Sequence, residues 1–281
     1  MAIKRPYQLA ILGSGAMGQA LCCGLLRADL FSAENVICAD IDEDKLARLR
    51  DETGVNTTKS NIDAVKSAEN IMLSVKPFMI DAVLDEISSV LSTDQLVISI
   101  AAGVTIEHIM KRLPEGTPVV RAMPNTPSLV GLGATGFCLS ANARPQDAEL
   151  AKSIFNAVGQ VVEVPEKLID AVTGLSGSGP AYVYLMIESM MEAGVSVGLT
   201  RDAALLLSAQ TVLGAAKMVL ETGAQPAELR SMVTTPGGTT IAGLAAMERG
   251  SFRATIIDAV QAATKRAQEL SQPEKKGGGT K

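Results

Sequence analysis

The stretch Tyr7-Gln-Leu-Ala-Ile-Leu-Gly13-Ser-Gly15-Ala-Met-Gly18 decides the fold predicted for this chain of 281 residues. Its first half is a short apolar run typical of a buried strand, and the residues from Ala16 to Ala28 have the pattern of a helix. Between strand and helix lies the spacing G-x-G-x-x-G, which in this setting holds the pyrophosphate of a dinucleotide. The sequence therefore predicts a dinucleotide site at this turn; the alternative is a tight turn without a ligand.

The three glycines of this turn are expected to have separate roles. Gly13 permits the tight turn, Gly15 lets the backbone approach the pyrophosphate, and Gly18 lets the helix pack close to the strand. The N-terminus of the helix adds unpaired N–H groups and the positive end of its dipole, both of which attract phosphates. This turn is therefore the expected phosphate site.

Asp40 follows the second predicted strand, about twenty residues after the glycines, where a carboxylate accepts hydrogen bonds from the adenosine ribose. Asp42 and Asp44 add negative charge, so a ribose 2′-phosphate would be repelled there. This pattern favours tolerance of NADH, whereas three nearby cations could offset the repulsion and admit NADPH: Lys45, Arg48 and Lys59. The alternative is that the three acids are solvated loop residues.

Short apolar runs alternate with helical patterns over residues 1–165, which predicts an α/β domain with a mostly parallel sheet covered by helices on both faces. After the first strand, further strands are expected at Asn35–Ala39, Asn70–Val75, Gln95–Ile100 and Pro118–Ala122. Gly136–Leu139 and Gln160–Val164 are expected to complete the sheet beyond the parallel set. The N-terminal domain is therefore expected to be Rossmann-like.

Strand patterns stop after Pro165, and two helices that are apolar nearly all round are predicted at Ala181–Val197 and Arg201–Leu220. Such helices must be buried on every side, and a region of this size does not bury them easily alone. We therefore expect an intertwined helical dimer. The predicted domains are a dinucleotide-binding domain over 1–165, an all-α substrate-binding and dimerisation domain over 166–271, and a disordered tail over 272–281.

Composition and charge exclude several classes of function. A net charge of −5 and the absence of Trp disfavour nucleic-acid binding. Glu188 and Glu192 interrupt the most apolar long stretch, so no membrane span is expected, and the N-terminus lacks the apolar core of a signal peptide. One histidine, His108, and four cysteines without a CxxC pair predict no metal site and a reducing, cytoplasmic location.

Three loops follow predicted strands at their carboxyl ends, where open α/β sheets bind ligands. They are Val75-Lys-Pro77, Ala101-Ala-Gly103 and Met123-Pro-Asn-Thr-Pro127. Two prolines stiffen the last loop, and its Asn125 is expected to position a nicotinamide amide or an ordered water. A Gly/Ser turn is also expected before a helix at Leu175–Pro180.

Thr234-Thr-Pro-Gly-Gly-Thr-Thr240 precedes a helical pattern that runs to Met247. Glycines before a helix start, followed by hydroxyls, make a cradle of N–H and O–H donors for a small carboxylate. The alternative is an ordinary helix cap supplied by threonine.

Together with Asp170-Ala-Val-Thr-Gly-Leu-Ser-Gly-Ser-Gly-Pro-Ala-Tyr182, these motifs resemble the pyrroline-5-carboxylate reductase family in order and over nearly the whole chain. The resemblance implies reduction of 1-pyrroline-5-carboxylate to L-proline, the last step of proline biosynthesis, usually with NADPH. It implies a Rossmann domain followed by a helical domain that interlocks into dimers, often assembled into decamers. Members that use NADPH tend to have Ser, Thr or Arg where this chain has Asp40.

The resemblance also assigns roles to individual positions. The pyrophosphate is expected on Leu12, Gly13, Ser14, Gly15, Ala16 and Met17, and the adenosine on Asp40 and Asn61. The nicotinamide side is expected at Val75, Lys76, Pro77, Ala101, Ala102 and Asn125. The substrate carboxylate is expected on Thr235, Gly238, Thr239 and Thr240, with the Thr240 hydroxyl near the imine nitrogen as the catalytic group.

Other readings of the motifs fit less well. A β-hydroxyacid dehydrogenase needs a lysine on the helix after a Gly-rich turn, but the helix expected from Gly179 has none before Lys217. A hydrolase elbow G-x-S-x-G fails because Ser178 stands where the last glycine belongs. A non-catalytic nucleotide sensor would keep the glycine turn but needs no carboxylate cradle, so oxidation of the coenzyme that depends on the imine would discriminate the two.

Overall fold

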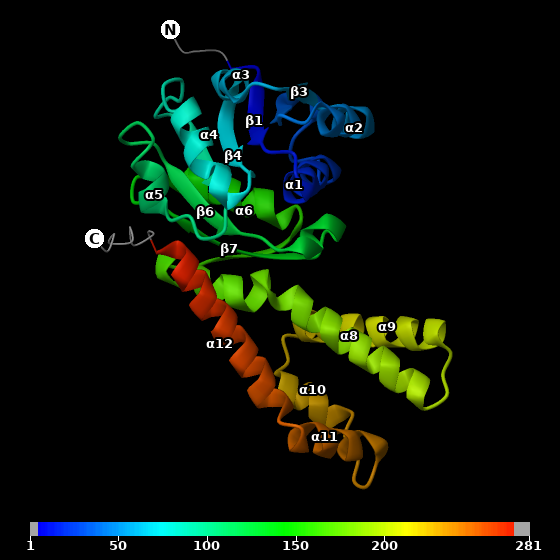
Figure 1. Cartoon of the computed structure of the whole chain (residues 1–281). Coiled ribbons are helices and arrows are strands. Elements are labelled where there is room, and N and C mark those ends of the chain that lie inside the picture. The colour runs from blue at the N-terminus through cyan, green and yellow to red at the C-terminus, as the bar shows by residue number, and fades with distance from the viewer. Residues whose placement is uncertain (1–4, 273–281) are drawn as a thin grey trace, which may run out of the picture. The chain divides into compact units, whose positions relative to one another are not determined.

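The computed structural model describes residues 5–272. By packing, these residues form two compact units, which Figure 1 shows. The first unit contains the chain up to Ser178 together with the residues from Ala262 onward, and the second contains Gly179–Gln261. The predicted tail over 272–281 lies, apart from Gln272, outside the described residues.

An eight-stranded sheet with the order β3-β2-β1-β4-β5-β6-β7-β8 is the centre of the first unit. Neighbouring strands from β3 to β6 pair in parallel, β7 pairs antiparallel with β6, and β8 pairs parallel with β7. The strands are β1 (Tyr7–Leu12), β2 (Val36–Ala39), β3 (Asn56–Thr58), β4 (Ala68–Leu73), β5 (Leu96–Ser99), β6 (Val119–Met123), β7 (Gly133–Leu139) and β8 (Gly159–Glu163). The predicted Rossmann-like, mostly parallel sheet is confirmed, and β3 is an edge strand that the sequence pattern did not indicate.

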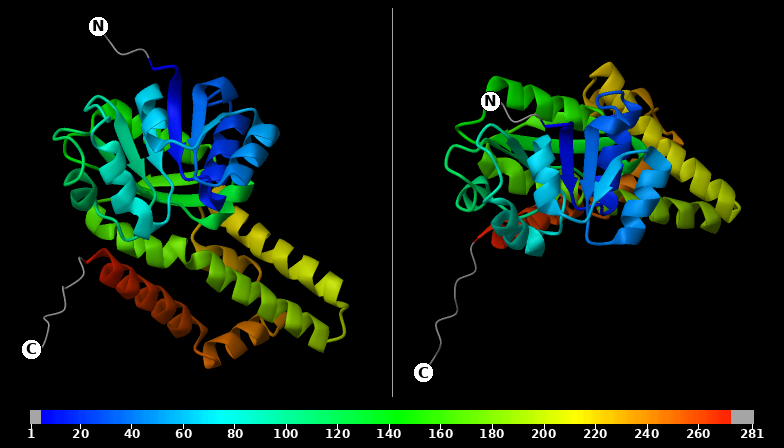
Figure 2. Two further views of the ribbon diagram at one scale, coloured as in Figure 1. Left: turned by 45° about the horizontal axis from the view of Figure 1, so that its top comes forward. Right: turned by 90° about the horizontal axis from the view of Figure 1, so that it is seen from above.

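Helices cover both faces of this sheet (Figure 2). Successive residues of β1 point to opposite faces, so Leu9 and Ile11 pack into one apolar core while Ala10 and Leu12 pack into the other. The first-unit helices are α1 (Ala16–Arg27), α2 (Glu43–Thr53), α3 (Asn61–Ser67), α4 (Ile80–Ile87), α5 (Ile106–Met110), α6 (Pro145–Asn156) and α7 (Ile169–Val172). Helices α1 and α6 border the core that contains Leu9, and helices α3, α4 and α5 border the other.

The segment Thr173–Gly177 is a π-helical turn that follows α7 directly, where the sequence predicted a Gly/Ser turn. Proline at position 180 explains the difference. Pro180 has no N–H, so the carbonyl of Ser176, four residues earlier, cannot receive its ordinary helical hydrogen bond. The helical path therefore widens at this point, as single π-turns within helices do.

The second unit consists of helices in the described chain: α8 (Gly179–Ser196), α9 (Arg201–Thr222), α10 (Pro226–Met232), α11 (Thr239–Arg249) and the first part of α12 (Phe252–Ser271). The two apolar helices predicted from the sequence are confirmed as α8 and α9. The two helices pack closely at Gly194, where a Cβ would lie only 2.9 Å from the Cβ of Ala204.

Helix α9 is apolar on its exposed sides as well. Leu206 is 68% exposed and Leu220 is 74% exposed, and the described unit provides no cover for them. By length and composition alone, α9 is also the one helix among residues 5–272 that could cross a membrane. An apolar helix of this kind needs either a partner or lipid, and the sequence predicts a partner.

The last turns of α12 belong to the first unit. The Ser271 hydroxyl donates a hydrogen bond of 2.9 Å to Asp170, and the backbone of Leu270 lies 3.3 Å from the position that a Cβ on Gly103 would occupy. Gly103 has φ +78°, a conformation that favours glycine. The chain thus returns to the first unit beside one of the loops at the carboxyl ends of the strands.

Candidate functional site

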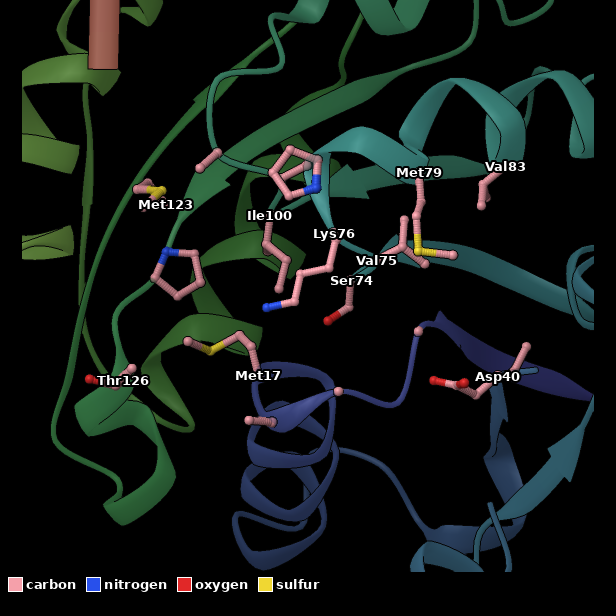
Figure 3. A pocket seen from close by; sticks show the side chains of 18 of the residues that line it. Met17, Asp40, Ser74, Val75, Lys76, Met79, Val83, Ile100, Met123 and Thr126 are labelled. Carbon is pink, nitrogen blue, oxygen red and sulfur yellow. The ribbon is translucent and has the colours of Figure 1, made fainter. Parts of the chain in front are cut away.

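A cavity of about 560 Å³ opens at the carboxyl ends of β1, β2, β4, β5 and β6 (Figure 3). Of the residues predicted to bind the coenzyme, these line it: Gly13, Gly15, Ala16, Met17, Asp40, Asn61, Val75, Lys76, Pro77, Ala101, Ala102 and Asn125. The remaining two, Leu12 and Ser14, are 0% and 1% exposed, so they lie behind the lining. Met123 and Thr126 of the predicted loop and Gly177 of the predicted Gly/Ser turn also line the cavity. Sequence reasoning missed other residues of the wall: Ile41, Ser74, Met79, Val83, Ile100 and Leu129.

The glycine turn has the geometry that a bound pyrophosphate needs. Gly13 has φ +100°, and a Cβ there would lie 2.8 Å from the backbone of Ser74 and Val75. A Cβ at Gly18 would clash with the carbonyl oxygen of Gly13. At Gly15, by contrast, a Cβ would meet nothing within 4 Å. The space beside Gly15 is open, and a side chain would fill it.

Helix α1 begins directly behind this opening. Its N-cap is Gly15, and no side chain caps the helix. The first-turn N–H groups are therefore left for a ligand, with the positive end of the helix dipole behind them. The hydroxyl of Ser74, which lines the cavity, is buried and has no hydrogen-bond partner among the described residues. These features fit a dinucleotide with its phosphates at the turn.

The Asp40 carboxylate is held by the backbone. One oxygen accepts a hydrogen bond of 2.7 Å from the N–H of Ser14, and the other accepts one of 3.0 Å from the N–H of Asp42. The N–H of Ser14 is therefore occupied within the protein. Because an ionised carboxylate has about four acceptor positions, Asp40 can still accept hydrogen bonds from a ribose.

Two of the three cations expected near Asp40 are paired with acids, whereas Arg48 donates from Nε to the backbone carbonyl of Asp44 at 3.3 Å. The ammonium of Lys45, which lines the cavity, lies 3.1 Å from Asp42, and the ammonium of Lys59 lies 2.7 Å from Glu43. The N–H and ammonium of Lys45 lower the pKa of Asp42. The negative charge at this end of the cavity is therefore only partly offset.

Lys76 provides a cation in the middle of the cavity. Figure 3 shows its side chain directed into the cavity, between Ser74 and Ile100. Among the described residues, its ammonium has no salt-bridge or hydrogen-bond partner. Pro77 follows it and holds Lys76 extended, at φ −61° and ψ 147°. An unpaired ammonium in a cavity is a ready contact for a negatively charged ligand.

Asn125 lines the cavity, but its amide is engaged by the protein. The Nδ2 group donates to the carbonyl of Ser176, and Oδ1 accepts from the N–H of Ala134, both at 2.9 Å. The side chain is also largely buried, at 8% exposure. Two contacts within the protein therefore fix the orientation of this amide. One N–H and one lone pair are left over, so its contact with a nicotinamide amide or an ordered water stays a prediction.

The four residues predicted to bind the substrate lie in the second unit, at the start of α11. Gly238 is the N-cap of this helix, and no side chain caps it, so the alternative of a threonine cap is wrong. Gly237 has φ +68°, and the Gly238 N–H donates to the Thr235 carbonyl at 3.1 Å. The first-turn N–H groups of Thr239 and Thr240 are thus available to an anion. The cavity described above is lined by first-unit residues alone.

His108 is not among the residues that line the cavity. Its Nε2 atom is 2.5 Å from Asp81 on α4, and Arg112 pairs with the same carboxylate at 2.7 Å. The side chains of His108 and Asp81 are partly exposed.

Comparison with known proteins gives matches over both parts of the chain. A family model described as pyrroline-5-carboxylate reductase dimerisation matches residues 166–270, and one described as NADP oxidoreductase, coenzyme F420-dependent, matches residues 8–103. The sequence is 44% identical to the pyrroline-5-carboxylate reductase of Methanosarcina acetivorans, over 94% of this chain and 98% of the relative. It is 40% identical to that of Arabidopsis thaliana, over 95% and 96%.

Solved structures of the same name are also similar. The pyrroline-5-carboxylate reductase of Coxiella burnetii superposes with a TM-score of 0.90 at 40% identity, covering 96% of this chain and all of that one. The Plasmodium falciparum pyrroline carboxylate reductase, crystallised with NADP bound, has a TM-score of 0.85 at 33% identity, with the same coverage.

Proposed function

This chain belongs to the pyrroline-5-carboxylate reductase family, and we propose that it reduces 1-pyrroline-5-carboxylate to L-proline with a reduced nicotinamide dinucleotide. This is the last step of proline biosynthesis. The observation that carries the proposal furthest is the cavity at the glycine turn, where an uncapped helix, an open space beside Gly15 and the free ammonium of Lys76 meet. We further propose that domain 1–165 binds the coenzyme and that domain 166–271 binds the substrate and the partner subunit.

The coenzyme would lie along the carboxyl ends of the strands. The backbone from Leu12 to Met17 would hold the pyrophosphate, with Asp40 and Asn61 at the adenosine end. Val75, Lys76, Pro77, Ala101, Ala102 and Asn125 would border the nicotinamide end. Bound there, the reduced nicotinamide supplies a hydride to the carbon of the substrate C=N bond.

The protein then has to hold the imine in line with the hydride donor. A protonated imine is already a strong electrophile, so orientation at near-attack distance is the main requirement. This is consistent with a site that uses neither histidine nor paired carboxylates.

The substrate carboxylate would bind the N-terminus of α11. Thr235, Gly238, Thr239 and Thr240 supply backbone N–H groups and hydroxyls there, and the helix dipole favours an anion. With the carboxylate fixed, one face of the ring is presented to the hydride. The Thr240 hydroxyl donates a hydrogen bond to the lone pair of the neutral imine nitrogen and transfers its proton there, while solvent returns a proton to the hydroxyl. The hydride then adds to the carbon of the protonated C=N bond.

We propose that the enzyme accepts NADH as well as NADPH. The relative from Plasmodium falciparum was crystallised with NADP, and the N-terminal family model is described as an NADP oxidoreductase. In this chain, however, Asp40 lines the cavity, and the Lys45 ammonium beside it is paired with Asp42. A 2′-phosphate would therefore meet a carboxylate, and the lysine that lines the cavity beside it is already paired.

We also propose self-association through the helices of residues 166–271, with dimers assembled further into decamers. The exposed apolar sides of α9 and the dimerisation family model support an interface there. All four cysteines are free thiols, which supports the reducing environment of the cytoplasm.

The purified chain with synthetic 1-pyrroline-5-carboxylate tests this function. We expect loss of reduced-nicotinamide absorbance that saturates with the imine, and formation of one proline for each coenzyme oxidised. Coenzyme binding without turnover of the imine would contradict the proposal and favour a nucleotide sensor.

A further inference from the structure

We infer that Asn125 is a positioning residue, which fixes the cavity wall formed by Met123 and Gly177. It does so by donating a hydrogen bond to the backbone carbonyl of Ser176, which Pro180 leaves without a helical donor. The inference rests on the proposed function, because it concerns the end of the cavity where the nicotinamide would bind. In this role Asn125 affects the coenzyme through the position of the cavity wall and not through a direct contact of its amide. Three structural observations support it.

The first observation is the missing helical donor. In a continuous α-helix the N–H of residue 180 would bond to the carbonyl of Ser176, but proline has no N–H. The chain forms a π-turn instead, with the N–H of Ser178 bonded to the carbonyl of Thr173 at 2.8 Å. The carbonyl of Ser176, a partly buried residue, is thus left without its ordinary helical donor.

The second observation is that Asn125 supplies this donor in a fixed orientation. Its Nδ2 group donates to Ser176 at 2.9 Å while its Oδ1 atom accepts from Ala134, on β7, at 2.9 Å. The bridge requires a donor toward Ser176 and an acceptor toward Ala134, and an amide side chain has both. Aspartate keeps the acceptor but cannot donate when ionised.

The third observation is the location of this bridge. Met123, Asn125 and Gly177 all line the cavity, and a Cβ at Gly177 would lie 2.9 Å from the terminal methyl carbon of Met123. Figure 3 shows Met123 and Thr126 at the side of the cavity opposite Asp40. The Asn125 bridge therefore sets the distance between the β6 loop and the π-turn at one end of the cavity only.

Asn125→Asp tests this role, with two ligands as probes. Reduced dinucleotide binding is measured by its own fluorescence, and ADP-ribose, which lacks the nicotinamide, is measured by calorimetry. Removing one buried hydrogen-bond donor predicts about a tenfold rise in the Kd of the reduced dinucleotide. The Kd of ADP-ribose stays within about twofold, because its contacts are at the Asp40 end.

Asn142→Asp is the matched control. Asn142 also donates from Nδ2 to a backbone carbonyl, that of Thr117, at 2.9 Å, but it does not line the cavity. We expect this variant to leave both Kd values within about twofold of the parent. If Asn125→Asp is not obtained folded, Asn125→Ala enters the same comparison.

Pro180→Ala provides the second half of the test. It restores an N–H that can bond to Ser176, so the carbonyl no longer depends on Asn125. In this background Asn125→Asp raises the Kd of the reduced dinucleotide by about threefold or less. Three results would each overturn the inference. Asn125→Asp could raise the Kd of both ligands equally, or raise the Kd of the reduced dinucleotide no more than Asn142→Asp does. It could also raise that Kd by the same factor in the Pro180→Ala background as in the parent. A parent protein that binds the dinucleotide but does not reduce the imine contradicts the proposed function alone, since both probes measure binding.

Discussion

The carboxylate of Asp40 accepts a hydrogen bond of 2.7 Å from the backbone N–H of Ser14, which joins the end of β2 to the glycine turn after β1. One residue therefore serves two purposes at the adenosine end of the cavity. It orders the turn and, in the proposed coenzyme pose, places negative charge where a 2′-phosphate would lie.

Asp40→Ser is expected to shift the ratio of kcat/KM for NADPH over NADH upward by about tenfold. The substitution removes the repelling charge, while the weaker hydrogen bond to Ser14 reduces the efficiency with NADH. Steady-state rates with both coenzymes on one imine preparation measure this ratio. Asp44→Ser, which removes an exposed acid outside the cavity lining, is the control, and an equal shift there would show that the effect is one of general charge.

Gly15→Ala and Gly13→Ala form a matched pair, in which the first is expected to weaken coenzyme binding and the second to lower stability. At Gly15 a Cβ meets no protein atom within 4 Å, so folding is retained, but the methyl group occupies the open space that a phosphate would need. We expect the coenzyme Kd to rise by tenfold or more with the thermal midpoint nearly unchanged. Gly13→Ala is expected to lose about 1–3 kcal/mol of stability, since φ is +100° and the Cβ would lie 2.8 Å from backbone. Coenzyme binding by Gly15→Ala at parental strength would argue against a phosphate at this turn.

Thr240→Ala is expected to lower kcat by tenfold or more, because a hydrogen-bond donor at the imine nitrogen is lost. Thr234→Ala is the control from the same loop. The Thr234 hydroxyl donates to the carbonyl of Arg230 at 2.7 Å and is not assigned to the substrate. Turnover by Thr240→Ala within twofold of the parent would show that this hydroxyl has no catalytic role.

Asp147 is expected to make the protein sensitive to acid. Burial alone would raise the pKa of this carboxyl, but hydrogen bonds from the side chain and backbone N–H of Arg144 outweigh burial and lower the pKa. Because the folded-state pKa is depressed, the stabilisation is complete above the unfolded value of about 3.9 and is lost as the pH falls through the folded value.

The thermal midpoint measured from pH 7 to pH 2 at one protein concentration tests this. Asp147→Asn should lower the midpoint at pH 7, through loss of about 1 kcal/mol of capping at α6, and should lose less than the parent on acidification. Parallel curves for the two proteins would exclude Asp147 as a source of the acid sensitivity.

Leu206→Glu is expected to reduce the size of the assembly. This side chain is 68% exposed on α9, and a buried charge at a subunit interface is strongly unfavourable. Sedimentation velocity at micromolar concentration should show a smaller species than the parent. Leu132→Glu, at a leucine that is 63% exposed in the first unit, should leave the parent assembly intact. A monomeric parent protein would contradict the proposed interface.

The loops around the cavity were predictable because local chemistry marks them. Glycine spacing identified the turn after β1, and prolines marked the loops after β4 and β6. The ends of parallel strands then had to meet at one edge of the sheet. Strand β3 escaped prediction because Asn56-Thr-Thr58 has no apolar pattern and pairs only at the sheet edge.

The direction of individual side chains was not predictable in the same way. Asn125 is bonded to Ser176, a residue far away in the sequence, and nothing near Asn125 indicates this partner. The π-turn was missed because Gly and Ser are typical of loops, although Pro180 signals that a carbonyl four residues earlier lacks a donor. Which side chain supplies that donor depends on the packing of β6 and β7 against the turn.

The return of α12 makes the second unit an insertion within the first. Residues 179–261 interrupt a unit that resumes at Ala262, where the final turns meet Gly103 and Asp170. Truncating the chain at one position therefore either removes the last turns of α12 from the first unit or keeps the second unit. A minimal fragment has to join residues 5–178 to residues 262–272 through a linker.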